Sequence, residues 1–277
     1  MKNLNKIIPW LKKSNMRCVR NDSQAYYVDD TVKRDELIAN IYRNMLAGAA
    51  WHEAIRTSKA TEHGERVAEY AFASSLLIDY NPTAILDVGC VLNNHVISDV
   101  VGRHRRLFFL NPSVETVVYP EYTYFKFPLS KWDINLTFPF VTCLSTIEHI
   151  GFDNTRYGSN EIDKGWDWDQ CIHEVVKSIN ILSAMTAPGG IMVASCPYGC
   201  PEYVLHPPVT GVRTAQTLHL KHVQALRDTF GDTMEIITLR LSSEGWVMDA
   251  VDAVYQPYGS IGPGASGLIL MILKKPY

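Results

Sequence analysis

The chain has 277 residues, of which 47% are hydrophobic and 20% charged, a composition typical of an ordinary folded globular protein. A formal net charge of −3 argues against a basic surface that binds a phosphate backbone, so nucleic acid is not expected as a partner. No uninterrupted run of about 18 apolar residues occurs, and no membrane span is expected. Because the N-terminus also lacks the apolar core of a signal peptide, we expect a cytoplasmic protein with reduced cysteines.

Two amphipathic helices are expected before residue 83. The first, over 33–48, has a helical stripe that ends at Gly48 and consists of Leu37, Ile38, Ile41, Tyr42 and Met45. The second, over 62–80, is stopped by Asn81-Pro82 and has the stripe Val67, Tyr70, Ala71, Ser74 and Leu77. We expect residues 1–64 to form a helical extension that either caps a binding crevice or makes a homodimer contact.

From residue 83 onward, short apolar runs alternate with helical segments. The expected strands are 84–88, 106–110, 122–127, 140–145, 190–195, 234–241 and 267–274. Helices are expected over 168–186 and 214–229. Continuous apolar strands that alternate with helices favour a parallel sheet covered on both faces. The sequence therefore predicts an α/β fold with a doubly wound, mostly parallel seven-stranded sheet, and a long loop over 251–267 able to fold over a site.

A pair of cysteines in Cys196-Pro-Tyr-Gly-Cys200 raises the question of a metal site. A structural zinc site needs about four ligands, which His219 and His222 could complete on paper. The chain has no second cysteine pair at this kind of spacing. We therefore interpret the segment as a turn that carries two unrelated thiols, and no metal is expected.

Three segments resemble motifs of the class I S-adenosylmethionine-dependent methyltransferases. ILDVGC (85–90) is similar to the end of the family's first strand and its glycine loop. CLSTIEHI (143–150) resembles the motif at strand four, and APGGIMVAS (187–195) the proline-glycine-glycine turn into strand five. The expected strand 267–274 matches the strand that the family inserts antiparallel beside its sixth. The resemblance covers residues 65–277 and implies a Rossmann-like methyltransferase domain with S-adenosylmethionine as its cofactor.

In open parallel sheets, ligands bind beyond the carboxyl ends of the strands, where the strand order switches. Asp87 is expected to orient the glycine loop through backbone N–H groups or to meet the methionine amino group of the cofactor through water. The alternative is that it is a simple helix-capping or turn carboxylate. Where the family has further glycines this chain has Val91 and Asn93, and we expect Asn93 and Asn94 to take the positive φ values, which asparagine adopts cheaply. The resemblance implies cofactor contacts from Asp87, Gly89, Cys90, Asn93, Asn111, Leu129, Ser145 and Thr146.

Two acidic positions of the family are missing. Asn111 stands where a carboxylate commonly bridges the ribose hydroxyls; it can accept and donate but lacks the charge. Phe127-Pro128-Leu129 has no acidic residue for the adenine amino group, although Phe127 or Leu129 could pack on the ring and Asp133 is a distant substitute. These departures keep open a catalytically inactive binding or scaffold protein on the same fold. A dinucleotide-dependent enzyme is disfavoured because the loop lacks the second and third glycines.

Glu148 and His149, directly after the fourth strand, are the expected catalytic pair, with Asp153 close behind. Methyl transfer to oxygen requires removal of the acceptor proton, and imidazole titrates near operating pH. The alternative is that the pair caps the following helix or pairs with its neighbours.

An acceptor site is expected from the polar and aromatic stretch 151–169, whose residue types suit a sugar. The alternative is a surface loop over buried aromatic rings. CLSTIEHIGFDNTRYG (143–158) also resembles methyltransferase-like proteins of bacterial surface-glycan or sugar modification. The expected activity is O-methylation of a sugar, nucleotide-sugar or small polar metabolite. Arg213 is interpreted either as a ligand for a phosphate or, equally, as a surface arginine. The expected substrate contacts are Tyr157, Trp168, Tyr198 and Arg213.

Overall fold

The structure is a computed structural model that describes residues 22–56, 64–102, 105–113, 115–205, 212–243, 245–251, 258 and 265–277. The side chains of residues 22–32 and of residue 156 are not described. Most of the loop expected over 251–267 therefore lies outside the described residues.

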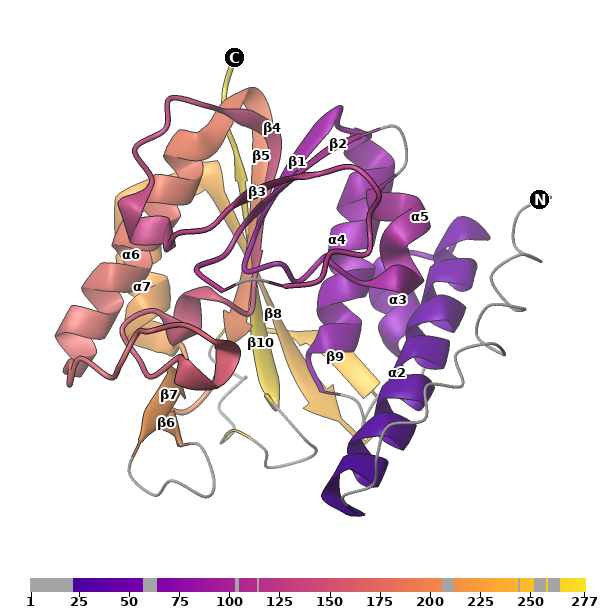
Figure 1. Cartoon of the computed structure of the whole chain (residues 1–277), viewed down its shortest axis with the longest axis horizontal. Helices are drawn as coiled ribbons and strands as arrows, with labels where there is room; N and C mark the ends of the chain where they lie inside the picture. The colour runs from indigo at the N-terminus through magenta and orange to yellow at the C-terminus, as the bar shows by residue number, and fades with distance from the viewer. Residues whose placement is uncertain are drawn as a thin grey trace.

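A central sheet of eight strands runs in the order β3-β2-β1-β4-β5-β10-β8-β9 (Figure 1). In that order the strands are β3 (Thr123–Phe125), β2 (Arg106–Leu110), β1 (Ala84–Val88), β4 (Phe138–Leu144), β5 (Thr186–Pro197), β10 (Gly267–Lys274), β8 (Met234–Ser242) and β9 (Gly245–Asp249). The first five are parallel, whereas β10 is antiparallel to both β5 and β8. The expected doubly wound, mostly parallel sheet is confirmed, including the last strand inserted antiparallel.

All seven expected strands are present, and β9 adds an eighth by forming a hairpin with β8. The helix expected over 214–229 is wrong in its first part. There, β7 (Arg213–Gln216) pairs antiparallel with β6 (Tyr203–Leu205), and the helix α7 runs over Leu220–Phe230. The helix starts late because His219 caps it: its ring accepts a hydrogen bond from the backbone N–H of Lys221.

Helices cover both faces of the sheet (Figure 1). One face carries α2 (Asp22–Leu46), α3 (Trp51–Arg56), α4 (Arg66–Tyr80) and α5 (Ser98–Val101); the other carries α6 (Trp168–Met185) and α7. Short 3₁₀ helices occur at η3 (His95–Ile97), η4 (Leu129–Lys131), η5 (Ile147–His149), η6 (Thr155–Tyr157) and η7 (Gly231–Thr233).

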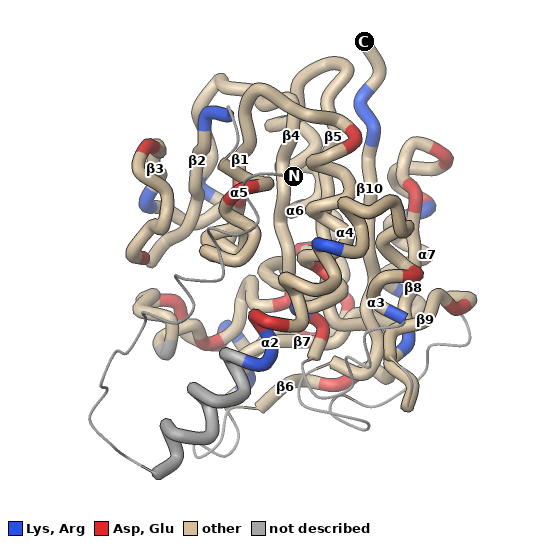
Figure 2. Tube along the Cα trace, turned by 90° about the vertical axis from the view of Figure 1, so that its right-hand side faces the viewer, with Lys and Arg blue, Asp and Glu red and all other residues tan. Residues whose placement is uncertain are grey.

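The two faces hold separate hydrophobic cores because side chains alternate along each strand. Ile85 packs in the core beneath α2–α4, while its neighbour Leu86 packs in the core beneath α6 and α7. Strand β10 repeats the pattern, with Leu268 in the first core and Ile269 in the second. Figure 2 shows that β4 and β5 carry no charged residue, as strands buried on both faces require.

The described part of the N-terminal extension belongs to the first core. Ile38 and Ile41 of α2 and Ala54 and Ile55 of α3 are buried there, next to α4. A domain boundary at residue 64 and a homodimer contact stay predictions. Among the described residues, no helix combines the length and the apolarity that crossing a bilayer requires.

Candidate active site

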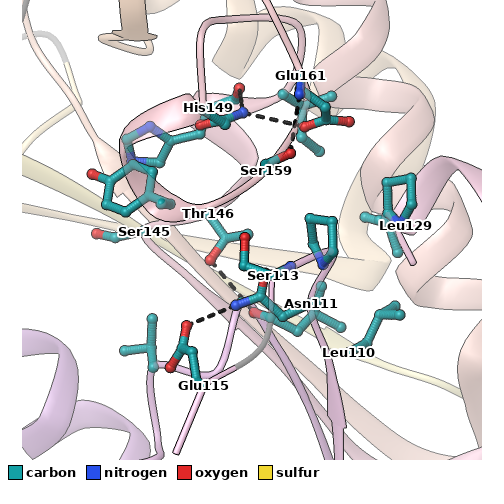
Figure 3. A pocket seen from close by; sticks show the side chains of 18 of the residues that line it. Leu110, Asn111, Ser113, Glu115, Leu129, Ser145, Thr146, His149, Ser159 and Glu161 are labelled. Atoms are coloured by element: carbon teal, nitrogen blue, oxygen red, sulfur yellow. Dashed lines mark hydrogen bonds between the residues drawn. The ribbon is translucent and has the colours of Figure 1, made fainter. Parts of the chain in front are cut away.

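A cavity of about 230 Å³ lies at the carboxyl ends of β1, β2 and β4. This is the edge at which ligands bind in open parallel sheets. Seven of the residues expected at the site line it: Gly89, Asn111, Leu129, Ser145, Thr146, His149 and Tyr157. Figure 3 shows Asn111 and Glu115 toward one end of the view and His149, Ser159 and Glu161 toward the other, with Thr146 between them.

The turn after β1 is held by Asp87, which is buried beneath the cavity lining. One carboxylate oxygen accepts from the backbone N–H of Leu92 at 2.8 Å, as expected for a residue that orients the loop. The other accepts from the Thr142 hydroxyl at 2.8 Å. Burial raises the pKa of Asp87 to about 7, although these two hydrogen bonds lower it.

The expectation that asparagines take the positive φ values in this turn is wrong. Those values belong to Gly89 at +92° and Cys90 at +59°. Asn93 instead bridges the loop to residues 116 and 118 through its side-chain amide, and Asn94 accepts from the backbone N–H of Val96 at 2.8 Å. Leu92 points into the first core and Val91 lines the cavity, so the turn leaves the cavity open.

Gly89 provides a test of how closely the turn approaches the β4 loop. A Cβ at Gly89 would lie 2.0 Å from the Thr146 hydroxyl oxygen, whereas a Cβ at Gly48, also at positive φ, would meet nothing within 4 Å. We expect Gly89→Ala to lower the free energy of unfolding by about 3 kcal/mol and Gly48→Ala by about 1–2 kcal/mol. Urea denaturation of both variants measures the difference, and equal losses would contradict the close approach.

Glu115 supplies a carboxylate beside Asn111 that sequence reasoning missed. The Asn111 amide donates to a Glu115 carboxylate oxygen at 2.7 Å, and both side chains line the cavity. Burial raises the pKa of Glu115, while hydrogen bonds from Asn93 and Asn111 lower it. The sequence has Asn111 in place of a carboxylate at the end of β2, and Glu115 supplies a carboxylate from the loop four residues later.

His149 stands in η5, directly after β4, with a defined ring orientation. Its Nδ1 lies 2.7 Å from the carbonyl oxygen of Thr214 in β7. Because a carbonyl only accepts, Nδ1 of the neutral ring carries the proton, and Nε2 is the basic nitrogen. Nε2 lies 3.9 Å from a Glu148 carboxylate oxygen. Glu148 itself is buried outside the cavity lining, which raises its pKa well above the usual range.

A buried network under the cavity centres on Glu69 of α4. Its carboxylate accepts from Arg66 at 2.7 Å and from the hydroxyls of Ser145 and Ser195. Arg66 and Ser145 line the cavity, so Glu69 positions two of its walls. Sequence reasoning missed both charged residues; the available signal was an acidic residue, Glu69, between the apolar stripe positions Val67 and Tyr70.

The loop after His149 forms the remaining wall. Asn154 is buried, and its amide donates to the His149 carbonyl oxygen at 2.9 Å and to a Glu161 carboxylate oxygen at 3.2 Å. The Tyr157 ring meets the His149 ring edge-on at 5.4 Å between centroids and is 48% exposed. The His149 imidazole, the Tyr157 ring and the Glu161 carboxylate therefore come from one continuous segment.

Three expected substrate contacts lie outside the cavity lining. Trp168 stacks on Tyr203 with 4.4 Å between ring centroids. The Tyr198 hydroxyl is turned to the Val251 carbonyl oxygen at 2.9 Å. Arg213 forms a bidentate pair with Asp163 at 2.7 and 2.8 Å. The guanidinium that was expected to hold a phosphate is therefore already paired with a carboxylate. Trp168 and Arg213 both pack against the ring of Tyr203 in β6, so these two side chains hold the β6–β7 hairpin.

Three further expected residues also serve the structure around the cavity. Cys90 and Asn93 belong to the turn but do not line the cavity. Asp153 accepts from the backbone N–H and the hydroxyl of Thr155. Cys196 is buried in β5, and the described residues contain no group of three or more metal-ligating side chains.

No protein-family model and no curated protein matches the sequence. Several solved structures are similar. The complex of DhpI with S-adenosylhomocysteine is 11% identical at a TM-score of 0.44, over 87% of this chain and 98% of that one. CalS10, an amino pentose methyltransferase of Micromonospora echinaspora, is 14% identical at a TM-score of 0.43, over 94% and 100%. A 1,6-didemethyltoxoflavin-N1-methyltransferase of Burkholderia thailandensis is 13% identical at 0.41, over 93% of each chain. Such low values transfer no ligand or substrate to this chain.

Proposed function

We propose that the chain is an S-adenosylmethionine-dependent methyltransferase that acts on a hydroxyl group of a sugar or another small polar molecule. The observation that carries this proposal is a single cavity that joins the Gly89 turn, the Asn111–Glu115 pair and His149. The first two suit a nucleoside, and the third suits an acceptor whose proton must be removed.

The residues around the turn fit the cofactor. Glu115 and Asn111 together offer charged and neutral acceptors for a ribose diol. Leu110 and Leu129 give apolar walls for a flat ring. When bound, S-adenosylmethionine would supply an electrophilic methyl group whose bond to the positively charged sulfur breaks in the transfer, which leaves the neutral thioether S-adenosylhomocysteine.

The chain's own contribution to the chemistry is to hold the acceptor and accept its proton. Nε2 of His149 takes the hydroxyl proton as the new oxygen–carbon bond forms, because the Thr214 carbonyl keeps the ring proton on Nδ1. The β6–β7 hairpin thereby sets the tautomer of His149. The imidazolium then releases the proton to solvent.

Two measurements test the proposal. Calorimetry should detect binding of S-adenosylmethionine and S-adenosylhomocysteine, and mass spectrometry should detect a methylated product in a panel of small sugars. Absence of both heat and thermal stabilisation at millimolar ligand would contradict the proposal. Binding without turnover of any acceptor would favour the catalytically inactive alternative, which the departures at Val91 and Asn111 motivate and the cavity at His149 opposes.

Glu115→Gln is expected to weaken S-adenosylhomocysteine binding by about tenfold. The amide keeps the shape but removes the charge, which about doubles the strength of such a hydrogen bond. Titration calorimetry measures the change. Glu121→Gln is the matched control, because Glu121 is exposed and does not line the cavity. Equal affinities of the two variants would show that Glu115 does not bind the ligand.

A further inference from the structure

The acceptor end of the cavity carries a carboxylate that no described cation neutralises. Glu161 is half-buried and lines the cavity with His149 and Tyr157. One of its oxygens accepts from the neutral amide of Asn154 at 3.2 Å. The ion pairs formed among the described residues do not include Glu161. With respect to the described side chains, its charge is therefore available to a ligand.

The other charges around the cavity reinforce this acidic character. Among the described lining residues, the acidic and basic side chains other than His149 are Arg66, Glu115 and Glu161. Arg66 is already paired with the buried Glu69. Arg213, the cation expected to bind a phosphate, is paired with Asp163 outside the lining. Among the described side chains, a phosphorylated acceptor would thus meet a carboxylate with no cation to offset it, and like charges brought together oppose binding.

The Glu161 carboxylate is also held in a fixed relation to the base. The buried Asn154 amide contacts both the His149 carbonyl oxygen and Glu161. The backbone N–H of Glu161 donates to the Ser159 hydroxyl at 3.2 Å, which fixes the other side of the loop. A group bound by Glu161 is therefore placed at a set position relative to the His149 ring (Figure 3).

We propose that Glu161 binds an ammonium group of the acceptor, so that the substrate class is a hydroxylated molecule bearing an amine, such as an amino sugar. The ammonium is a handle for orientation, and the hydroxyl that faces His149 receives the methyl group. This inference rests on the proposed methyltransferase function. It replaces the expectation of a nucleotide-linked sugar, whose phosphates this end of the cavity disfavours.

The test uses the full chain saturated with S-adenosylhomocysteine and three probes at neutral pH: D-glucose, D-glucosamine and D-glucosamine 6-phosphate. Ligand-observed NMR titration gives the three dissociation constants. We expect D-glucosamine to bind about tenfold more tightly than D-glucose, as a charge-assisted hydrogen bond provides, and the phosphate to bind more weakly than D-glucosamine. The preference should decrease with added salt.

Two variants assign the preference to Glu161. Glu161→Gln keeps an acceptor for Asn154 and should abolish the preference for the amine. Glu235→Gln removes the same charge from an exposed position on β8, which does not line the cavity, and should keep the preference. Thermal unfolding of both variants checks that they remain folded.

Equal binding of D-glucose and D-glucosamine, tighter binding of the phosphate, binding of none of the three, or a preference that survives in Glu161→Gln would each overturn the inference. The proposed function is scored separately in the same samples by S-adenosylhomocysteine binding. Its loss would reject both statements, whereas its retention with any of these four results rejects only the role of Glu161.

Discussion

Replacing Glu69 by alanine is expected to lower the free energy of unfolding by about 3 kcal/mol, because the change breaks a partly buried ion pair on one side only. Glu69 has no exposed surface and accepts from Arg66, Ser145 and Ser195. Its removal leaves a guanidinium and two hydroxyls without their acceptor. Urea denaturation measures the loss, and S-adenosylhomocysteine binding should weaken with it because Arg66 and Ser145 line the cavity.

Glu174→Ala is the matched control for this prediction. Glu174 pairs with Lys177 at 2.8 Å on the solvent side of α6, where the lysine side chain is 48% exposed. Exposed pairs of this kind contribute about 0.3–0.5 kcal/mol on a helix. A loss for Glu69→Ala as small as the loss for Glu174→Ala would show that the network under the cavity is not important for stability.

The sheet was predictable because most of its strands are continuous apolar runs in the sequence. Strands such as β4 and β10 are buried on both faces, so nearly every residue in them is apolar. The elements that escaped prediction lack this signal. β7 (Arg213–Gln216) has mixed polarity and was absorbed into the following helix, and β9 is an edge strand with Met248 exposed on it.

The lining residues of the cavity were predictable where they follow strand ends directly. They were not predictable where they come from long loops or from helix α4. Gly89, Ser145 and Thr146 follow β1 and β4 directly, so the sheet order alone brings them together. Arg66 reaches the cavity from α4, and Glu115 and Glu161 reach it through loop paths that no periodic pattern encodes. Composition alone favoured Trp168 and Arg213 as ligand contacts, but side chains of these types can equally satisfy one another.

His149→Gln is expected to lower kcat by about 10²–10⁴-fold while S-adenosylhomocysteine binding stays unchanged. The substitution removes Nε2 of the ring. This nitrogen is the basic one because Nδ1 contacts the Thr214 carbonyl oxygen and carries the ring proton. The ring lies at the acceptor end of the cavity, away from the Asn111–Glu115 pair in Figure 3, so the cofactor end should be intact. Methyl transfer to an acceptor identified in the sugar panel, followed by mass spectrometry, gives kcat, and calorimetry gives the dissociation constant.

His173→Gln serves as the control, because His173 is an exposed histidine of α6 that does not line the cavity. It should leave both kcat and binding unchanged. A His149→Gln variant that keeps kcat within a few-fold of the unmodified chain would mean that proton removal does not limit the reaction and that His149 only places the acceptor. A parallel loss of S-adenosylhomocysteine binding would instead assign His149 to the architecture of the cavity, because Asn154 ties its backbone to the loop that ends at Glu161.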